Sequence, residues 1–533
     1  MTCLRAFLSG LLPVLAFAFQ QQPAGFTISG MMVEHATNRP LSGVLVVLSA
    51  NGHPGWQLSG LTDNDGRFSF INLPAAKYSL MAMRPGERQI HGFQGTEGFS
   101  TGIVTGPGMN TGNLNFPLDA PASISGTVVD ENGDPVRQAS VLLLRKSVSS
   151  GQEQVTMASR ILTRSSGRFR FPHLSPGIYF IAVQARPWYA QQLQSGAPEA
   201  EKARELDVAY PVTYYGNTSD GAAAAPITLA EGASVTVQID VRAVPAVHVS
   251  LTGMSPTEGG GWSMGFNATT EGPGGFPIQT PASVACANNS CELTGFAPGR
   301  YTVEIPHSFQ SRERSKRTVD LTDGSTISVQ NRTPTSVSGR VVFEGMEHPP
   351  KGAGVMLSDG RQSFNTQVQQ DGSFSFSSVP PTPGRYEVYV HNAPGSYVRS
   401  VAAKGAAASG DTIEIADGAS IQLLIDAGKG VLSNLDGIAL KDGKPAAAAM
   451  VLLLPHDLYR SALIRRDQSD SDGTFTLPNA TPGRYTLLAI DDGRDLAYQD
   501  PAVIKPYLSQ GQTIDLPLKD NARVKVAVIA RKR

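Results

Sequence analysis

Short runs of alternating polar and apolar residues recur along the chain, and each run follows a polar turn that ends in glycine. The stretches "DNDGRFSF", "SSGRFRF", "QDGSFSF" and "SDGTFTL" place a phenylalanine or leucine at every second position after that glycine. A period of two residues is typical of a β-strand with one buried face. Asp, Asn and Ser favour turns, and glycine accepts a positive φ. The pattern predicts four strands that begin after Gly66, Gly167, Gly372 and Gly473.

A second strand is expected to complete each hairpin, because an alternating run begins at a tyrosine shortly afterwards. A Pro-Gly step precedes this tyrosine in four copies, and Ala75-Ala76 replaces it in the first. A fifth, divergent copy is "CANNSCELTGFAPGRYTVEI", which begins at Cys286. The five tyrosines are Tyr78, Tyr179, Tyr301, Tyr386 and Tyr485.

Strand-like elements also flank each hairpin and define a unit. Upstream lies a strand, a turn and an apolar strand, as in "ISGTVVDENGDPVRQASVLLL" from Ile124, and downstream lies a strand pair around a glycine, as in "ITLAEGASVTVQIDV" from Ile227. Gly66 and Gly167 are 101 residues apart, and so are Gly372 and Gly473. About seven short strands per unit are enough for a two-sheet sandwich with its own core.

We therefore expect an all-β chain of five tandem β-sandwiches arranged as a rod, whose bend is set by contacts between neighbours. The only helix we expect outside the N-terminal segment is two turns within residues 196–210. The expected segments are 1–18 (a signal peptide), 19–119, 120–245 (with a long loop), 246–331 (divergent), 332–429 and 430–533.

These repeated strings resemble the carboxypeptidase regulatory-like domain. The residues that carry the resemblance are "SGTVVDENGDPVRQASV", "SSGRFRFPHLSPGIYFIAV" and their copies. The resemblance implies Ig-like or transthyretin-like sandwiches, close to the collagen-binding-protein B-type repeats and grouped with carbohydrate-binding-like folds. It is specific for the fold and says little about function. In metallocarboxypeptidases this domain is an appendage to a separate zinc domain, which has no counterpart in this sequence.

Charge and the N-terminal segment bear on location. The net charge is -1 with 17% charged residues, which does not favour binding to nucleic acid or anionic lipid. Arg5 is followed by an apolar run from Ala6 to Ala18, with small residues at 16 and 18. This is the pattern of a cleaved signal peptide, with a short membrane anchor as the alternative. We expect export to the periplasm, the outer-membrane surface or the medium, with no membrane span in the mature chain.

Three cysteines are present, and Cys3 would be removed with the signal. Cys291 lies ten residues before Tyr301, where the other units place their first inward aromatic residue. With Asn288-Asn289 as the turn, Cys286 lies opposite Cys291 across the hairpin. Opposed strand positions are close enough for a disulfide, which an exported protein permits. We expect a structural disulfide between them, with a free or redox-active pair as the alternative.

The sequence offers little catalytic or metal-binding chemistry, so we expect no enzyme activity and no cofactor. "GWSMG" around Ser263 matches a nucleophile pattern that needs a strand before it and a helix after it, and a helix is not expected here. Turn chemistry explains "DNDG" at Asp63 and "DSDG" at Asp470 better than a calcium loop does. The basic run "SRERSKR" from Ser311 is expected at a solvated strand edge.

Aromatic residues in the long loop of the second unit are the best ligand candidates, because exposed rings stack on sugar faces. Burial against the end of the sandwich or the next unit is the alternative. The leading hypothesis is a non-catalytic, exported binding, adhesive or spacer protein whose partner is a glycan or an envelope protein. The alternative is an accessory subunit that docks on an outer-membrane transport or protease complex. The candidate ligand contacts are Trp188, Tyr189, Tyr210, Tyr214 and Tyr215.

Overall fold

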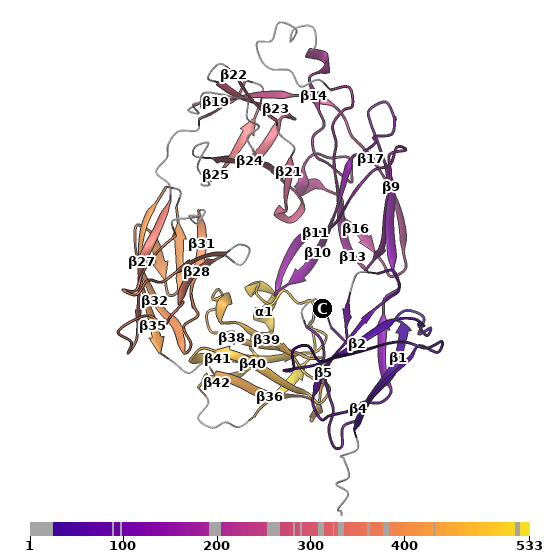
Figure 1. Ribbon diagram of the computed structural model, residues 1–533, viewed down its shortest axis with the longest axis vertical. Helices are drawn as coiled ribbons and strands as arrows, with labels where there is room; N and C mark the ends of the chain where they lie inside the picture. The colour runs from indigo at the N-terminus through magenta and orange to yellow at the C-terminus, as the bar shows by residue number, and fades with distance from the viewer. Residues whose placement is uncertain are drawn as a thin grey trace, which may run out of the picture.

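Five β-sandwiches follow one another along the chain, and this confirms the expected all-β fold (Figure 1). Each has its own cluster of buried apolar side chains. The computed structural model describes residues 25–87, 90–95, 99–190, 204–252, 267–280, 283–287, 290–306, 314–322, 324–328, 335–359, 363–376, 383–416, 418–429, 433–517 and 523–532. The expected signal peptide, residues 1–18, lies outside the described residues.

Sandwiches 1 and 2 each pack a three-stranded sheet against a second, larger sheet. Sandwich 1 comprises β1 (Phe26–Glu34), β2 (Leu45–Ala50), β3 (Gln57–Leu61), β4 (Arg67–Leu73), β5 (Lys77–Met83), β6 (His91–Gly92), β7 (Ile103–Val104) and β8 (Leu114–Leu118). Sandwich 2 comprises β9 (Ala122–Val129), β10 (Ser140–Ser149), β11 (Gln152–Leu162), β12 (Arg168–Leu174), β13 (Gly177–Gln184), η1 (Arg204–Leu206), β14 (Val208–Ala209), β15 (Thr213–Tyr214), η2 (Gly221–Ala223), β16 (Ile227–Leu229), β17 (Ser234–Asp240) and β18 (Val244–Pro245).

Sandwiches 3 and 4 also have two sheets, whereas the strands of sandwich 5 form one continuous sheet because β43 pairs with both β36 and β41. Sandwich 3 comprises β19 (Val247–Thr252), β20 (Asn267–Glu271), η3 (Pro273–Gly275), β21 (Pro277–Thr280), β22 (Ser283–Ala287), β23 (Ser290–Phe296), β24 (Gly299–Pro306), β25 (Arg314–Leu321) and β26 (Thr326–Ser328). Sandwich 4 comprises β27 (Ser336–Phe343), β28 (Gly354–Ser358), β29 (Ser363–Gln367), β30 (Ser373–Ser375), β31 (Gly384–His391), β32 (Ser396–Lys404), β33 (Ala407–Ser409), β34 (Thr412–Ile415) and β35 (Ser420–Lys429). Sandwich 5 comprises β36 (Ser433–Lys441), β37 (Lys444–Pro445), β38 (Met450–Pro455), η4 (Ser461–Leu463), β39 (Arg465–Gln468), β40 (Thr474–Ala480), β41 (Gly483–Ile490), α1 (Pro501–Leu508), β42 (Gln512–Leu516) and β43 (Val524–Ile529).

The repeated hairpin builds each core as its period of two predicts. Phe169 and Phe171 in β12 are 5% and 2% exposed, while Arg168 and Arg170, which alternate with them, face solvent. The equivalent phenylalanines of β4, β30 and β40 are buried in the same way. Each recurring tyrosine is also buried, and Tyr179 donates a hydrogen bond from its hydroxyl to the carbonyl of Ser175, 2.8 Å away. The corresponding bond, four residues back, recurs at Tyr78, Tyr301 and Tyr485.

The glycine of the repeated "SG" step lies beneath the first hairpin phenylalanine. A Cβ atom on Gly126 would lie 2.4 Å from the carbonyl oxygen of Val237 in the parallel strand β17, and 2.6 Å from the Phe169 ring. Gly339 and Gly437 have the same two kinds of neighbour. The close approach of ring, strand and parallel partner therefore requires glycine at this position.

One helix of the structure was not expected from the sequence. Helix α1 spans Pro501–Leu508, with Asp500 accepting a hydrogen bond from the Ala502 N–H at its start. In the described part of residues 196–210 the only helical element is the single 3₁₀ turn η1. None of the helices in the described ranges has the length and apolar character needed to cross a bilayer.

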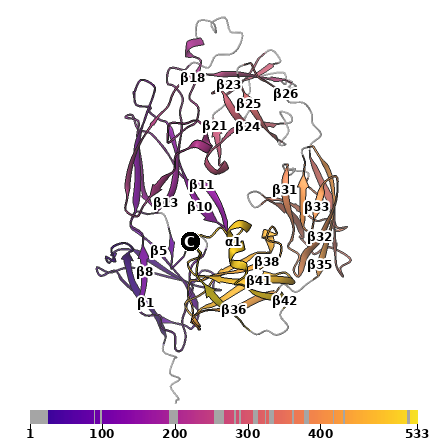
Figure 2. The ribbon, with the colours of Figure 1, turned by 180° about the vertical axis from the view of Figure 1, so that it is seen from behind.

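The expectation of a rod is wrong, because the sandwiches are arranged in a ring. The C-terminal sandwich (yellow) lies against the N-terminal sandwich (indigo) in both ribbon views (Figures 1 and 2). The loop before α1 also contacts sandwich 2, where the N–H of Gln499 donates to the carbonyl of Gly151 at 2.9 Å and the Gln499 side chain accepts from Gln152 at 2.8 Å. A rod follows if each sandwich contacts only the sandwiches next to it in the sequence. Sandwich 5 also contacts sandwiches 1 and 2, which are distant in the sequence, and this closes the ring.

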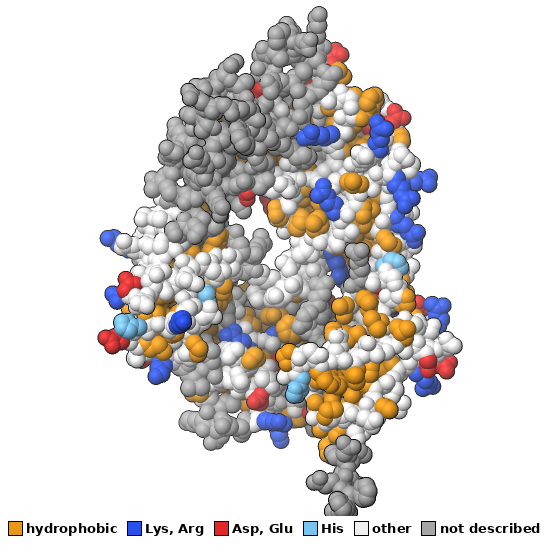
Figure 3. Space-filling view, viewed as in Figure 1, with side chains coloured by type: hydrophobic (Ala, Val, Ile, Leu, Met, Phe, Trp, Pro, Cys, Tyr) orange, Lys and Arg blue, Asp and Glu red, His pale blue; other side chains and the backbone are white. Residues whose placement is uncertain are grey.

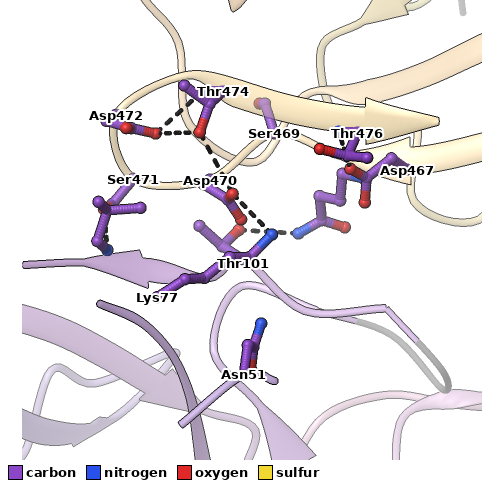
Figure 4. Close-up of polar contacts among 12 residues, drawn as sticks. Asn51, Lys77, Thr101, Asp467, Ser469, Asp470, Ser471, Asp472, Thr474 and Thr476 are labelled. Carbon is purple, nitrogen blue, oxygen red and sulfur yellow. Dashed lines mark hydrogen bonds and ion pairs between the residues drawn. The ribbon is translucent and has the colours of Figure 1, made fainter. Parts of the chain in front are cut away.

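The contact between sandwiches 1 and 5 involves the hairpin turn before β40 (Figure 4). Lys77 Nζ lies 2.7 Å from Asp470 Oδ2, and the N–H of Ser471 donates to the carbonyl of Gly102 at 2.8 Å. Gln468 donates from Nε2 to Thr101 Oγ1 at 2.8 Å. The turn that faces solvent in sandwich 1 is thus buried between sandwiches in sandwich 5.

Candidate ligand-binding site between sandwiches 2 and 3

The long connection of sandwich 2 runs from the end of β13 at Gln184 to the start of β16 at Ile227. Its described residues contain η1, η2 and two short strands, β14 and β15. β15 pairs with β13, and β14 pairs with β18 next to sandwich 3. The connection therefore brings its aromatic residues to the junction of sandwiches 2 and 3.

Trp188 is the most exposed candidate, with 80% of its surface accessible. Its ring lies 5.8 Å from the Tyr189 ring, at an interplanar angle of 89°. The Tyr189 hydroxyl donates to Glu131 Oε1 at 2.6 Å, and this hydrogen bond, with smaller contributions from burial and charge, raises the pKa of Tyr189 to about 12. The anchored tyrosine supports an indole that remains open to solvent on the rest of its surface.

Tyr210 lies behind this pair and belongs to the core cluster of sandwich 2, with 9% of its surface exposed. Burial raises its pKa, and the nearby charge of Glu131 adds to the effect. Its hydroxyl interacts with that of Tyr189. Tyr210 therefore stays neutral at physiological pH and joins the surface pair to the core.

Tyr214 and Tyr215 are placed differently from the other three. Tyr214 is fully buried in a cluster that includes Leu142, Val212 and Ile278 of sandwich 3, so it offers no surface to a ligand. Its hydroxyl has no hydrogen-bond partner within the described ranges, and burial raises its pKa. Tyr215 is half-buried and packs on the core of sandwich 2. The alternative interpretation, burial at the junction, thus holds for Tyr214.

A cavity of about 270 Å³ is lined by Pro187 and Ala190, the residues on either side of Trp188 and Tyr189. Its wall includes Thr280, whose hydroxyl is shielded from solvent and has no hydrogen-bond partner in the part of the chain that the structure describes. The cavity combines apolar walls with polar groups, as ligand sites commonly do. Residues that line it include Pro187, Ala190, Tyr210, Val212, Thr280 and Gly295.

An ion-pair cluster joins the two sandwiches close to this cavity. His248 in β19 lies between Asp207 of sandwich 2, at 2.5 Å from Nε2, and Glu292 of β23, at 3.1 Å from Nδ1. Burial by itself lowers the pKa of His248, but the two carboxylates outweigh it and the net shift is upward. Through contacts at both ring nitrogens, His248 links the loop of sandwich 2 to sandwich 3.

Other candidate positions are less informative. The backbone register pairs Cys286 with Cys291, as the turn spacing predicts, and the disulfide itself stays a prediction. Ser263 and residues 311–313 of the basic run lie outside the described residues. Asp63 accepts hydrogen bonds from the N–H groups of Asp65 and Arg67, which is turn chemistry.

Sequence reasoning missed the cavity and the ion-pair cluster. Asp207, His248 and Thr280 come from three separate segments, and no spacing in the chain relates them. The only available signal was the interruption of the strand pattern after Gln184, which pointed to the loop but not to the side of sandwich 3 that completes the site.

Comparisons with known proteins agree with the fold. Residues 123–211 match the carboxypeptidase regulatory-like domain, which confirms the resemblance inferred from the repeats for that segment. Among curated proteins, none matches the sequence of the chain.

Several solved pilin structures are similar to parts of the chain. The minor pilin GBS52 of Streptococcus agalactiae is 16% identical, with a TM-score of 0.22, over 44% of this chain and 99% of its own. A streptococcal ancillary pilin is 12% identical, with a TM-score of 0.19, over 54% and 99%. The shaft pilin SpaA of Lactobacillus rhamnosus GG is 12% identical, with a TM-score of 0.19, over 41% and 98%. TM-scores this low support no statement about function.

Proposed function

We propose that this chain, which contains a carboxypeptidase regulatory-like domain within a ring of five β-sandwiches, is an exported, non-catalytic protein that binds carbohydrate at the junction of sandwiches 2 and 3. A disulfide between Cys286 and Cys291 would stiffen the hairpin of sandwich 3 near this junction.

The exposure of Trp188 is the observation that carries the proposal. Large aromatic side chains are usually buried, and a tryptophan that is 80% exposed is an exception with a cost in solvation. Tyr189, held by its hydrogen bond to Glu131, contacts one side of the Trp188 ring and leaves the rest of the indole open for a sugar to stack on. The adjacent cavity has the polar residues Gln184 and Arg186 in its lining, which suit the hydroxyls of a sugar.

Glycan-array screening followed by titration calorimetry tests this function. Replacing Trp188 by alanine should weaken binding of any array hit by about 30-fold, the size of effect expected for a residue at the centre of a binding site. Tyr459→Ala is the matched control, because Tyr459 is an exposed aromatic residue of sandwich 5, at 63%, away from the cavity. Equal binding by Trp188→Ala and wild type would place the ligand elsewhere, and no array hit at all would refute carbohydrate binding.

A second candidate function, docking on an envelope complex as an accessory subunit, is favoured by an apolar patch on sandwich 1 (orange in Figure 3). Leu61 at the end of the outermost strand β3 is 67% exposed, and Ile71 in β4 is 63% exposed. An unpaired edge strand can accept a strand from a partner. Loss of co-purification with a membrane complex on Leu61→Lys, with no glycan binding by wild type, would support this alternative over the first.

A further inference from the structure

Three potential metal ligands meet where sandwich 1 joins sandwich 2. His35 directly follows β1, Asp119 directly follows β8, and Glu231 lies in the turn between β16 and β17. One ligand atom of each lies within 4.8 Å of those of the other two. We propose that His35, Asp119 and Glu231 form a binding site for a divalent transition-metal ion of the Zn²⁺ class, which fastens the joint between the two sandwiches.

The strand register explains why the first two ligands lie side by side. β1 and β8 are parallel neighbours, with Glu34 paired to Leu118, so the next residue of each strand extends from the same edge. The His35 N–H donates to the carbonyl of Leu118 at 2.9 Å, and Arg84 donates to the carbonyls of Leu118 and Asp119 at 2.9 and 2.8 Å. Hydrogen bonds to the backbone thus hold both positions.

Glu231 is oriented by the joint itself. Its Oε1 accepts hydrogen bonds from the N–H groups of Ala120 at 2.8 Å and Ala36 at 3.3 Å. Its other oxygen, Oε2, lies 3.5 Å from His35 Nδ1, and the Glu231 side chain is only 18% exposed. Hydrogen bonds to Oε1 therefore hold the carboxylate in place, while Oε2 faces the histidine. Metal-binding carboxylates are commonly oriented by hydrogen bonds in this way.

The two distances from His35 fit a small tetrahedral ion. With bonds of about 2.0–2.1 Å, neighbouring ligand atoms in a tetrahedral zinc site are about 3.3 Å apart. His35 Nδ1 lies 3.2 Å from Asp119 Oδ1 and 3.5 Å from Glu231 Oε2. An imidazole nitrogen among the ligands favours Zn²⁺ and its transition-metal neighbours over Ca²⁺ and Mg²⁺, which prefer oxygen ligands. His35 and Asp119 are 64% and 47% exposed, so the fourth position is open to water.

The competing explanation is a protonated His35 that forms ion pairs with both carboxylates without any metal. The two explanations differ in what Zn²⁺ does. A metal site takes up one ion per chain and releases protons when it fills, because its ligands must be deprotonated. An ion-pair cluster without a metal would not bind one Zn²⁺ per chain.

Equilibrium dialysis of the untagged full chain against Zn²⁺ tests the proposal, with Co²⁺ as a spectroscopic probe. Wild type should bind one Zn²⁺ per chain at this site, and its Co²⁺ form should show the strong visible absorption of a tetrahedral complex. Outer-shell partners contribute about 10- to 100-fold to metal affinity, so His35→Ala should weaken binding by at least about 100-fold. Glu231→Gln should also weaken binding strongly, since it keeps a hydrogen-bond acceptor for the two N–H groups but loses the anionic ligand.

His53→Ala is the matched control, because His53 is an exposed turn histidine of the same sandwich. This variant should bind Zn²⁺ as wild type does. Unchanged uptake in both His35→Ala and Glu231→Gln would overturn the site. Uptake of Ca²⁺ or Mg²⁺ in place of Zn²⁺ would overturn the proposed class of ion. Circular dichroism that matches wild type ensures that each variant is folded when its uptake is measured.

Discussion

Replacing Asp470 by asparagine should strengthen the contact between sandwiches 1 and 5 at neutral pH, although it removes an ion pair. Asp470 is 3% exposed, and burial raises its pKa to about 6 despite Lys77 at 2.7 Å. The charges of Asp467 and Asp472 add to the increase. The desolvation of the carboxylate therefore outweighs its attraction to Lys77, as is common for buried ion pairs.

The sign of the pH dependence follows from this raised pKa. When the contact opens, Asp470 returns to the ordinary value of 3.8, so between pH 3.8 and about 6 the closed form holds a proton that the open form has lost. The stabilisation is fully present below pH 3.8 and is lost as the pH rises through about 6. The shift corresponds to roughly a 100-fold change in the closing equilibrium, or about 3 kcal/mol. Lys77 is 37% exposed, and with this solvent access we expect about 2 kcal/mol.

Hydrogen exchange measured by mass spectrometry reports the opening of this contact. The N–H of Ser471 donates to Gly102 of sandwich 1, so its exchange requires the contact to open locally. After correction for the intrinsic pH dependence of exchange, protection of the peptide that contains Ser471 should fall between pH 4 and pH 7 in wild type. In Asp470→Asn it should stay high throughout this range.

Asp63→Asn is the matched control, because Asp63 occupies the same position of the hairpin turn in sandwich 1 and is exposed. It should leave the protection of Ser471 unchanged. The reasoning is refuted if protection rises with pH in wild type, or if Asp470→Asn lowers protection at pH 7, since either result would mean that the ionised pair stabilises the ring.

Three further predictions concern the sandwiches themselves. Gly126→Ala should lower the free energy of unfolding of sandwich 2 by about 1–3 kcal/mol, because the new Cβ would lie 2.4 Å from the Val237 carbonyl; calorimetry should show no such loss for Gly60→Ala, where no atom lies within 4 Å. Tyr179→Phe should cost about 1 kcal/mol in the same measurement through loss of the bond to Ser175, and a cost near zero would contradict the stabilising role of that bond. Thiol labelling of the unreduced, exported protein should leave Cys286 and Cys291 unmodified, and labelling of both would exclude the disulfide that their paired register permits.

The alternation of polar and apolar residues was sufficient to predict which side chains form the core of each sandwich. Phe169 and Phe475 follow a turn glycine with strict alternation, and burial of that face leaves only one register for the strand. Helix α1 begins with an Asp500 cap followed by proline at the first helical position, which favours a helix, whereas Pro506 inside it disfavours one, so local sequence gives conflicting signals there.

The ring and the completed site depended on contacts that no local pattern encodes. Lys77 and Asp470 are far apart in the chain, and each belongs to a segment that is already explained by its own hairpin. Tyr214 and Tyr215 are adjacent in the sequence, yet only the pairing of β15 with β13 decides that Tyr214 faces the junction with sandwich 3. The contacts between sandwiches depend on the shape and charge of their folded surfaces, which a local sequence pattern does not specify.

Tryptophan fluorescence with Trp188 as the sole tryptophan tests the proposed carbohydrate site most directly. Trp56→Phe and Trp262→Phe remove the other two indoles. Because Trp188 is 80% exposed, its emission should lie at long wavelength and be readily quenched by acrylamide in the free protein. An oligosaccharide that stacks on the ring should shift this emission to the blue and protect it from quenching. Saturating oligosaccharide that leaves both the emission and the quenching of Trp188 unchanged would contradict the account.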